Sequence, residues 1–292
     1  MGRLGDLKSR VASRSIRALS RLAGGHHITL DYPPSAEDAP RYGHGRPPHR
    51  RLEELIRAGS EGYRHILETI AGYADALARI EVSAVDPHEP SWENGMISGL
   101  DGATLYALMR DRRPARYLEI GSGNSTKFVA RGCRDGGLET RIASIDPHPR
   151  AEVDELCDEV IREPLEAAGL SPFSVLEAGD VVFFDGSHRA FMNSDVTVFF
   201  LEVLPALPTG VLVGIHDVYL PEDYPADIAG SYYSEQYMLA AYLLGGADVE
   251  IVLPAWWASS RPELAETLDG LWSRPGLDTV DRHGVSFWLA TK

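Results

Sequence analysis

The sequence contains few cysteines and no long apolar run, and both absences limit the classes of protein that it can encode. Only Cys133 and Cys157 occur among 292 residues, too few for a disulfide-rich secreted scaffold. We therefore expect two reduced thiols and a cytoplasmic location. No apolar run approaches the ~20 residues that a membrane-spanning helix needs. The opening residues MGRLGDLKSR also lack the apolar core of a secretory signal.

A shortage of basic residues excludes a further class, the general nucleic-acid binders. The net charge is −15, whereas nucleic-acid binding depends on Lys and Arg side chains that neutralise phosphates. The charge is uneven along the chain. Residues 1–60 carry 11 Lys and Arg against 6 Asp and Glu, and the remainder carries 17 against 37. A basic arm therefore precedes an acidic body.

The basic arm begins with a predicted amphipathic helix over residues 3–22. Its arginines recur along one side, next to a row of apolar residues: Arg10, Arg14, Arg17 and Arg21, beside Leu4, Leu7, Val11, Ala18 and Leu22. In one interpretation the helix lies on an anionic membrane surface, which would make the protein membrane-peripheral. In the other, which we favour, it packs on its own domain or on a second subunit of a homo-oligomer. A Pro- and Gly-rich stretch follows, so residues 1–50 are predicted to form a helix and an extended arm.

The rest of the chain divides into two parts by the periodicity of its apolar residues. A helical period runs from Leu52 to Ile80 with a break expected at Gly59–Ser60, so residues 51–91 are predicted to be a helical segment. In residues 92–292, short apolar strands alternate with helices, which is typical of a parallel sheet covered on both faces. We predict a Rossmann-like doubly wound α/β fold. The strands are expected within residues 115–123, 140–150, 180–188, 210–221, 248–255 and 284–292, and the helices within residues 97–111, 125–135, 151–161, 194–210 and 234–246.

Polar residues or glycines follow each of the four clearest predicted strands. In strand order they are Glu119–Thr126, Asp146, Asp185 with His188, and His216 with Asp217. Ligands of such sheets bind beyond the carboxyl ends of the strands. We therefore expect these residues to surround the functional site.

The loop GSGNST, residues 121–126, has the composition of a cofactor-binding turn. Its glycines let the backbone approach a ligand closely, and the helix after it offers free N–H groups. Asp146 follows Gly123 by 23 residues, the usual place for a carboxylate that binds a ribose diol. Nicotinamide cofactors prefer a third glycine where Thr126 stands, so a nicotinamide oxidoreductase is the weaker alternative.

Four stretches together resemble class I S-adenosylmethionine-dependent methyltransferases: YLEIGSGNST, IASIDPHPR, VVFFDGSHRAF and VLVGIHDVYLP. The resemblance covers residues 92–292 and is strongest to bacterial sugar and macrolide O-methyltransferases and to the cephalosporin-hydroxylase-like group. It implies a seven-stranded sheet whose last strand, SFWLATK, is antiparallel. It also implies S-adenosylmethionine as the cofactor, with its ribose on Asp146. The cofactor-binding residues expected on this basis are Glu119, Gly121, Ser122, Gly123, Asn124, Ser125, Asp146 and Asp185.

The residues after the third and fourth of these strands suit methyl transfer to a hydroxyl. An alcohol is a poor nucleophile until it loses its proton, and an imidazole titrates near the operating pH. The resemblance supports His188 as the base that takes this proton, with Asp185 and His216 beside it at the reaction centre. Related metal-dependent enzymes carry acids at the positions of Asp185 and Asp217, but His216 stands where an acid is common.

The sequence leaves open whether a divalent metal assists the reaction. The candidate ligands are Asp185, His216 and Asp217. Carboxylates alone suit Mg²⁺, whereas a histidine ligand favours Mn²⁺, Fe²⁺ or Zn²⁺. In the other interpretation, His216 only hydrogen-bonds to Asp185 or Asp217 within a metal-free polar network.

These observations predict an S-adenosylmethionine-dependent O-methyltransferase. Its acceptor would be a small molecule or a glycan, methylated on a hydroxyl of a sugar, glycan or natural product. The alternative is a non-catalytic cofactor-binding or scaffold protein of a surface-polysaccharide pathway, docked through its basic arm, because a fold by itself does not establish an activity.

Overall fold

The structure is a computed structural model, and it describes residues 39–292. The helix predicted over residues 3–22, and the membrane or subunit contact assigned to it, lie outside the described residues. Pro40–Lys292 form one compact unit. No helix in the described part of the chain is long and apolar enough to cross a membrane.

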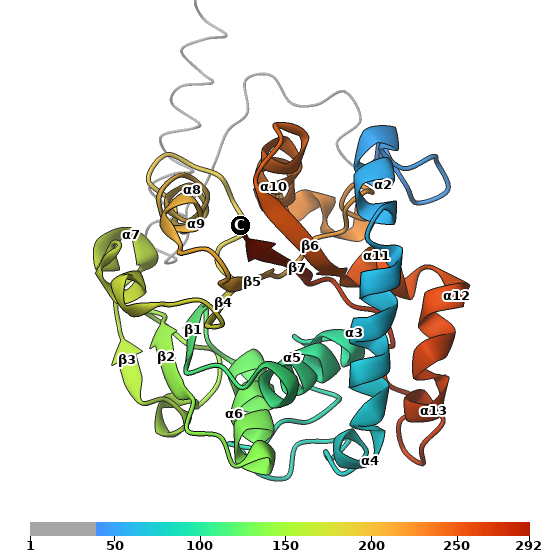
Figure 1. Cartoon of the computed structure of the whole chain (residues 1–292), viewed down its shortest axis with the longest axis vertical. Helices are drawn as coiled ribbons and strands as arrows, with labels where there is room; N and C mark the ends of the chain where they lie inside the picture. Colours follow the sequence, from blue (N-terminus) through green and yellow to red (C-terminus); the bar gives the residue numbers. More distant parts are fainter. Residues whose placement is uncertain (1–38) are drawn as a thin grey trace, which may run out of the picture. The chain divides into compact units, whose positions relative to one another are not determined.

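Seven strands form a single sheet. They are β1 (Arg116–Ile120), β2 (Arg141–Ile145), β3 (Glu159–Ile161), β4 (Val181–Phe184), β5 (Leu212–Ile215), β6 (Val249–Pro254) and β7 (Phe287–Thr291). Their order across the sheet is β3-β2-β1-β4-β5-β7-β6 (Figure 1). The first five pair in parallel, and β7 runs antiparallel between β5 and β6. The predicted doubly wound sheet with an antiparallel last strand is confirmed.

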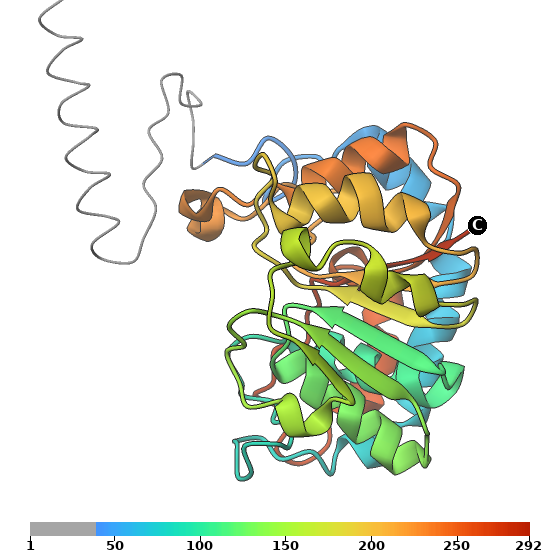
Figure 2. The ribbon, with the colours of Figure 1, turned by 90° about the vertical axis from the view of Figure 1, so that its left-hand side faces the viewer.

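Helices cover both faces of this sheet. Those after the first strand are α6 (Asn124–Gly136), α7 (Leu165–Ala168), α8 (Asp195–Val198), α9 (Leu204–Ala206), α10 (Glu235–Leu244), α11 (Ala255–Ser259), α12 (Pro262–Ala265) and α13 (Asp269–Trp272). A π-helical turn, Phe199–Val203, joins α8 to α9. Together with α5 (Gly99–Arg112), α6 lies against one face of the sheet, whereas α8, α9 and α10 lie against the other (Figures 1 and 2).

Burial on both faces explains why the strands are continuously apolar rather than alternating. All four residues of β4 are fully buried. On one side the ring of Phe184 stacks on Phe199 with 4.2 Å between centroids, and Phe183 stacks on Trp288 of β7 at 5.5 Å. The core therefore ends at Phe184, and the next residue, Asp185, begins the polar edge of the sheet.

The helix predicted over residues 151–161 is wrong. This stretch forms a 3₁₀ turn, Asp154–Leu156, and then the edge strand β3. Asp158 joins the edge strand to β2, because its N–H donates to Ile142 O and its Oδ2 accepts from Ile142 N, both at 2.8 Å. The β-branched pair Val160–Ile161 favours a strand. The free edge of β2 supplies the partner, which the periodicity of the sequence could not reveal.

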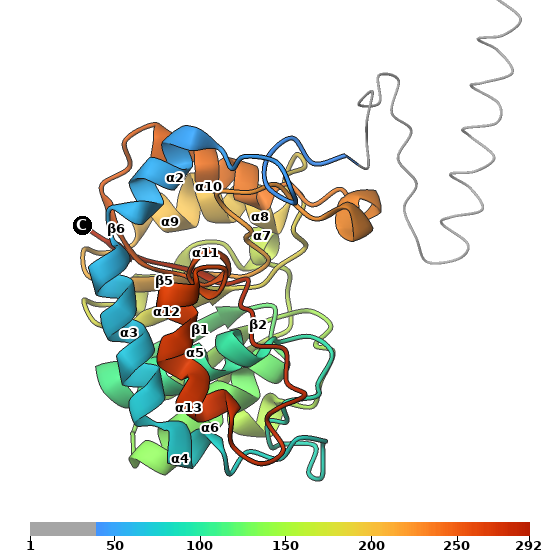
Figure 3. The same ribbon diagram turned by 90° about the vertical axis from the view of Figure 1, so that its right-hand side faces the viewer.

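The helical segment predicted over residues 51–91 breaks near Gly59–Ser60, as expected, and again at Tyr73, so that it forms three helices. They are α2 (Arg50–Arg57), α3 (Ser60–Gly72) and α4 (Ala74–Leu77). Their regularly spaced apolar side chains are buried: Leu52, Ile56, Tyr63, Leu67, Ile70 and Leu77. Figure 3 shows α3 alongside α12 and α13. These helices share one continuous core with the sheet.

The end of the predicted arm lies against the loop after β5. Tyr42 N donates to Asp223 Oδ2 at 3.1 Å, and the Nε2 of His44 lies 2.8 Å from Asp223 O. The chain is thus held to the body before α2 begins.

Candidate active site

The residues predicted at the strand ends lie along one edge of the sheet. Glu119 lies within β1 rather than after it. Four of the others are the first residue after their strand, and the N–H of each donates to the last carbonyl of the neighbouring strand. The pairs are Gly121 with Ile145, Asp146 with Ile161, Asp185 with Ile120, and His216 with Phe184, at 2.9–3.1 Å. Because these strands are parallel, their carboxyl ends meet at the same edge. The ladder itself therefore brings the four strand ends together.

Two histidines and two aspartates form a compact cluster at this edge. The Nε2 of His188 lies 3.4 Å from Asp185 Oδ1 and 3.5 Å from Asp217 Oδ2. The Nδ1 of His216 lies 3.4 Å from Asp185 Oδ1 and 3.7 Å from Asp217 Oδ1. Both imidazoles are buried, with 7% and 4% of their surface exposed. We name His188, His216, Asp185 and Asp217 the His–Asp cluster.

Two members of the His–Asp cluster adopt a backbone conformation that L-residues avoid. The φ angles of His188 and Asp217 are 62° and 55°, in the left-handed region. Strain of this kind persists where the surrounding structure imposes it, and it concentrates at functional sites. Two neighbouring turns are thus distorted to aim these side chains at one point.

Two further carboxylates, which the sequence interpretation missed, lie behind the histidines. Glu235 Oε1 is 2.5 Å from His188 Nδ1, and Asp101 Oδ2 is 3.4 Å from His216 Nε2. Both carboxylates are fully buried. Each lies in the first turn of a helix, α10 or α5, where acids are common because they interact favourably with the helix dipole. Because acids are common at this position, the sequence did not mark either residue as part of a site.

The carboxylates determine the charge of both imidazoles. Burial by itself lowers the pKa of His188, but the charge and hydrogen bond of Glu235, with Asp185 and Asp217, raise that pKa to about 9. Burial also lowers the pKa of His216, and the surrounding aspartates outweigh it and raise that pKa well above its usual value. With no ligand bound, these shifts favour the form of each ring that carries a proton on both nitrogens. His188 must lose one before it can act as a base.

Asp185 titrates in the opposite direction. Its burial favours the neutral acid, but the charge and hydrogen bond of His216, with the charge of His188, hold the pKa of Asp185 below its usual value. Asp185 thus stays an anion at the centre of the His–Asp cluster.

The His–Asp cluster contains a set of donors that suits a divalent ion. Asp185, His216 and Asp217 each offer one ligand atom, and these atoms lie within 4.8 Å of one another. Two carboxylates and one imidazole suit Mn²⁺, Fe²⁺ or Zn²⁺. Asp101 behind His216 resembles the outer carboxylates that orient histidine ligands. These three residues could therefore hold a divalent ion, which the sequence left open.

The glycine loop between β1 and α6 lies beside the His–Asp cluster. Gly121 has a φ of 83°, and a Cβ atom there would stand 1.8 Å from Asp185 O. A Cβ on Gly123 would meet nothing within 4 Å. Gly121 is thus required by the fold, whereas Gly123 leaves space in which a ligand could approach the backbone. Asn124 and Ser125 open α6, whose first N–H groups face the carboxyl edge of the sheet.

Glu119 and Ser122 support this loop from within. Thr126 Oγ1 donates to Glu119 Oε2 at 2.5 Å and accepts from Gly123 N at 3.1 Å, and Ser144 Oγ donates to Ser122 Oγ at 2.7 Å. Burial raises the pKa of Glu119 to about 8, so its carboxyl is neutral at pH 7. Its Oε1 is buried without a hydrogen-bond partner among the described residues.

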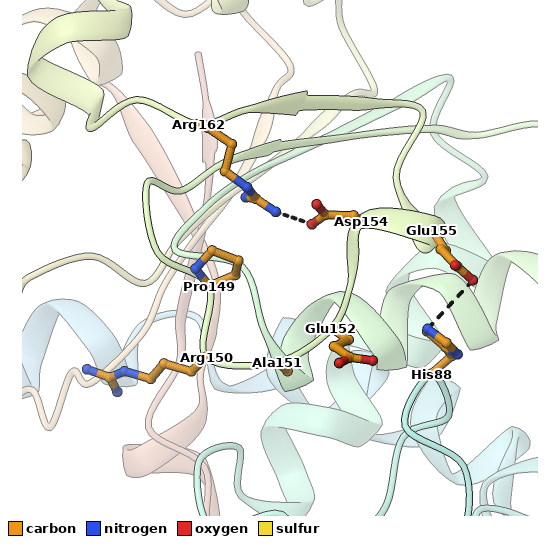
Figure 4. A pocket seen from close by; sticks show the side chains of 8 residues that line it. All are labelled: His88, Pro149, Arg150, Ala151, Glu152, Asp154, Glu155 and Arg162. Atoms are coloured by element: carbon orange, nitrogen blue, oxygen red, sulfur yellow. Dashed lines mark hydrogen bonds and ion pairs between the residues drawn. The ribbon is translucent and has the colours of Figure 1, made fainter.

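Asp146 precedes a segment, residues 149–152, that lines an open cavity of about 440 Å³. Its Oδ1 accepts from His148 N at 2.7 Å, and its carbonyl accepts from Arg162 Nη1 at 2.9 Å. The lining residues are His88, Pro149, Arg150, Ala151, Glu152, Asp154, Glu155 and Arg162 (Figure 4). Ion pairs join Arg162 to Asp154 and His88 to Glu155 across it. The cavity is of a size that holds small ligands. Asp146, the predicted ribose carboxylate, contacts its lining through Arg162 but does not itself line it.

Residues 118–218 match the family model of a methyltransferase domain. This part of the chain is therefore similar to methyltransferase domains. The match begins in β1 and ends one residue after Asp217, so it includes the glycine loop, Asp146 and the whole His–Asp cluster. The class I methyltransferase fold and the enzyme class predicted from the sequence are thereby confirmed. Glu235 and Asp101 lie outside the matched residues. A comparison with curated proteins found no match.

Solved structures of methyltransferases are similar to the chain. One is the O-methyltransferase TomG of Streptomyces achromogenes in complex with SAM, with 20% identity and a TM-score of 0.39 over 67% of this chain and 82% of TomG. Another is the SAH-bound methyltransferase PaMTH1 of Podospora anserina, with 18% identity and a TM-score of 0.44 over 86% of this chain and 100% of PaMTH1. A third is an O-methyltransferase of Bacillus cereus in complex with SAH, with 16% identity and a TM-score of 0.41 over 83% of this chain and 99% of the Bacillus enzyme. Likeness at this level carries no argument about the acceptor.

Proposed function

We propose that the methyltransferase domain uses S-adenosylmethionine to methylate a hydroxyl of a sugar, glycan or natural product. The observation that carries this proposal is the position of the His–Asp cluster directly beside the glycine loop, at the carboxyl edge of the sheet. A cofactor held on that loop would lie next to the groups that can bind a hydroxyl and take its proton.

The residues divide into a binding part and a reacting part. Gly121, Gly123 and the first turn of α6 would bind the amino-acid end of the cofactor, and Asp146 would accept hydrogen bonds from the ribose hydroxyls. When bound, S-adenosylmethionine supplies a methyl group on a sulfonium, an electrophile that needs alignment rather than activation. That methyl group would pass to the acceptor oxygen as its bond to sulfur breaks, and S-adenosylhomocysteine would remain.

His188 is the proposed base. Its Nε2 faces the space between Asp185 and Asp217, and Glu235 holds the opposite nitrogen. The hydroxyl proton moves to Nε2, which must first be unprotonated. Asp185, His216 and Asp217 would hold a divalent ion. Such an ion would lower the pKa of a bound hydroxyl.

Calorimetric titration with S-adenosylhomocysteine tests this proposal. We expect micromolar affinity in chelator-treated protein and again after Mg²⁺ or Mn²⁺ is restored. Asp146→Ala should weaken binding more than tenfold, since each charge-assisted hydrogen bond contributes about 1.5–3 kcal/mol. Asp248→Ala is the matched control, because Asp248 precedes β6 at the opposite edge of the sheet. Absence of binding by the folded protein would favour the scaffold alternative.

His188→Ala tests the reacting part separately. We expect unchanged affinity for S-adenosylhomocysteine and loss of turnover with an acceptor found by screening. Full turnover would remove His188 as the base.

The location, the partners and the domain boundaries predicted from the sequence stay proposals. They are a cytoplasmic protein, contact of residues 3–22 with a membrane surface or a second subunit, and boundaries near residues 51 and 92. Sedimentation with anionic vesicles and a mass measurement in solution would separate the two roles of the arm.

A further inference from the structure

Within residues 39–292, the buried carboxylate of Glu235 has a single hydrogen-bonding partner. Its Oε1 lies 2.5 Å from His188 Nδ1. Its Oε2 is buried and has no hydrogen-bond partner among the described residues. Burial of a carboxylate is costly unless its oxygens are paired. A side chain whose only hydrogen bond goes to one imidazole stabilises that imidazole and little else.

Asp101 provides the contrast within the same site. Its two oxygens accept from Val285 N, Ser286 N and Oγ, and Ser98 Oγ, at 2.5–2.9 Å. These bonds join the first turn of α5 to the start of β7. Asp101 therefore has a clear structural role in addition to its approach to His216, and Glu235 has none of that kind.

The start of α10 holds His188 from several directions. Ser234 N donates to His188 O at 2.7 Å, and Ser234 Oγ accepts from Ala190 N at 2.8 Å. The ring of Tyr233 lies against the imidazole with 4.4 Å between centroids. Glu235 then engages Nδ1. The only ring nitrogen left to face the His–Asp cluster is Nε2.

The hydrogen bond at one imidazole nitrogen determines which nitrogen keeps the proton. A carboxylate can only accept, so Glu235 retains a proton on Nδ1 when the ring becomes neutral. The lone pair then lies on Nε2, which faces the space between Asp185 and Asp217. The distances agree with this division: 2.5 Å on the Glu235 side is a short, strong hydrogen bond, and 3.4–3.5 Å on the other is not.

We propose that Glu235 is the positioning residue of His188, which keeps the proton on Nδ1 and aims the free electron pair of Nε2 at the acceptor hydroxyl. The part of the proposal that concerns the acceptor rests on the proposed function. The part that concerns the proton on Nδ1 does not, and it can be tested in the protein without any acceptor.

Nitrogen-edited NMR of protein labelled with ¹⁵N-histidine tests the proton on Nδ1. We expect a far-downfield Nδ1–H resonance that His188→Ala removes. Glu235→Gln should shift this resonance strongly upfield or abolish it, because the charged acceptor is lost. Absence of the resonance in the wild-type protein, or its persistence unchanged in Glu235→Gln, would overturn the proposal.

Thermal unfolding separates positioning from structural support. Glu235→Gln should lower the unfolding temperature less than Asp101→Asn does, because Glu235 has one side-chain hydrogen bond, to His188, whereas Asp101 accepts four from residues other than His216. Asp101→Asn is the matched control and should unfold at a lower temperature. If Glu235→Gln lost as much stability as Asp101→Asn while the His188 resonance stayed in place, Glu235 would be a structural residue.

Kinetics complete the test once an acceptor is known. Glu235→Gln should lower kcat roughly 100-fold or more, the range of general-base catalysis, with KM for S-adenosylmethionine unchanged. Glu235→Asp keeps the charge on a shorter side chain, and its kcat should lie between those of the wild type and Glu235→Gln. Unchanged kcat in Glu235→Gln contradicts the positioning role, whereas full turnover of His188→Ala contradicts the proposed base. The two failures are therefore distinguishable.

Discussion

At the scale of single residues, two glycines of one loop meet opposite demands. Gly121 has no room for a side chain, since a Cβ would collide with Asp185 O at 1.8 Å, and its φ of 83° disfavours any other residue. Gly123 has open space around it. The sequence motif treats the two alike, and only the structure separates a glycine that the fold needs from one with open space beside it.

A matched pair of variants checks this distinction. Gly121→Ala should destabilise the protein by at least about 1–3 kcal/mol through strain and displacement of Asp185. Gly123→Ala should retain the stability of the wild type and lose affinity for S-adenosylhomocysteine. Denaturant unfolding and calorimetric titration measure the two effects. Equal losses of stability would contradict the assignment.

At the scale of elements, α2 is joined to α11 by one buried carboxylate. Glu53 Oε2 accepts from Trp257 Nε1 at 2.9 Å, and its Oε1 accepts from Arg261 Nη2 at 3.0 Å. Trp257 is buried, and its ring packs edge-on to Tyr63 of α3 at 5.9 Å. The position of the N-terminal helices thus depends on residues some two hundred positions further along the chain.

Glu53→Ala should lower the free energy of unfolding by about 1–3 kcal/mol, because it leaves the indole N–H of Trp257 buried without an acceptor. The next residue supplies the control. Glu54 pairs with Arg50 on the surface, where ion pairs contribute little, so Glu54→Ala should hardly change stability. Urea unfolding of both variants measures the difference, and equal effects would show that the Trp257 bond is unimportant.

The accuracy of the element predictions followed from length and burial. β4 and β5 are wholly apolar, α3 is long enough to show a period, and α5 is buried on all sides over residues 99–109, and all four were predicted correctly. β3 has three residues and was predicted as part of a helix. Its conformation depends on pairing with β2 at the sheet edge, and a stretch so short carries too little periodicity to indicate a strand.

At the scale of the whole molecule, one core joins the helices before the sheet to the sheet itself. Ile56, Leu67 and Ile70 are buried in the same cluster as the strands, and α3 lies along α12 and α13 (Figure 3). The apolar face of α3 is therefore buried in this core rather than exposed to solvent.

We therefore expect Pro40–Lys292 to unfold in a single calorimetric transition, with equal calorimetric and van't Hoff enthalpies. A chain that begins at residue 92 should fail to fold, because it uncovers the apolar surface that α2 and α3 bury, whereas a chain that begins at residue 40 should fold. Two separate transitions, or a stable fragment from residue 92, would instead support a boundary between independent domains.

The sequence by itself determined the alternation of strands and helices, the glycine loop, and which polar residues follow which strand. Local patterns carry this information, because strand burial and turn chemistry depend on neighbouring residues. Only the tertiary structure decided that Glu235 bonds to His188, 47 residues away, that Asp101 lies behind His216, and that β3 completes the sheet. Those contacts depend on side-chain direction and on distances between elements, and no periodicity encodes either. The chemistry of the two imidazoles therefore became clear only when their buried carboxylate partners were seen.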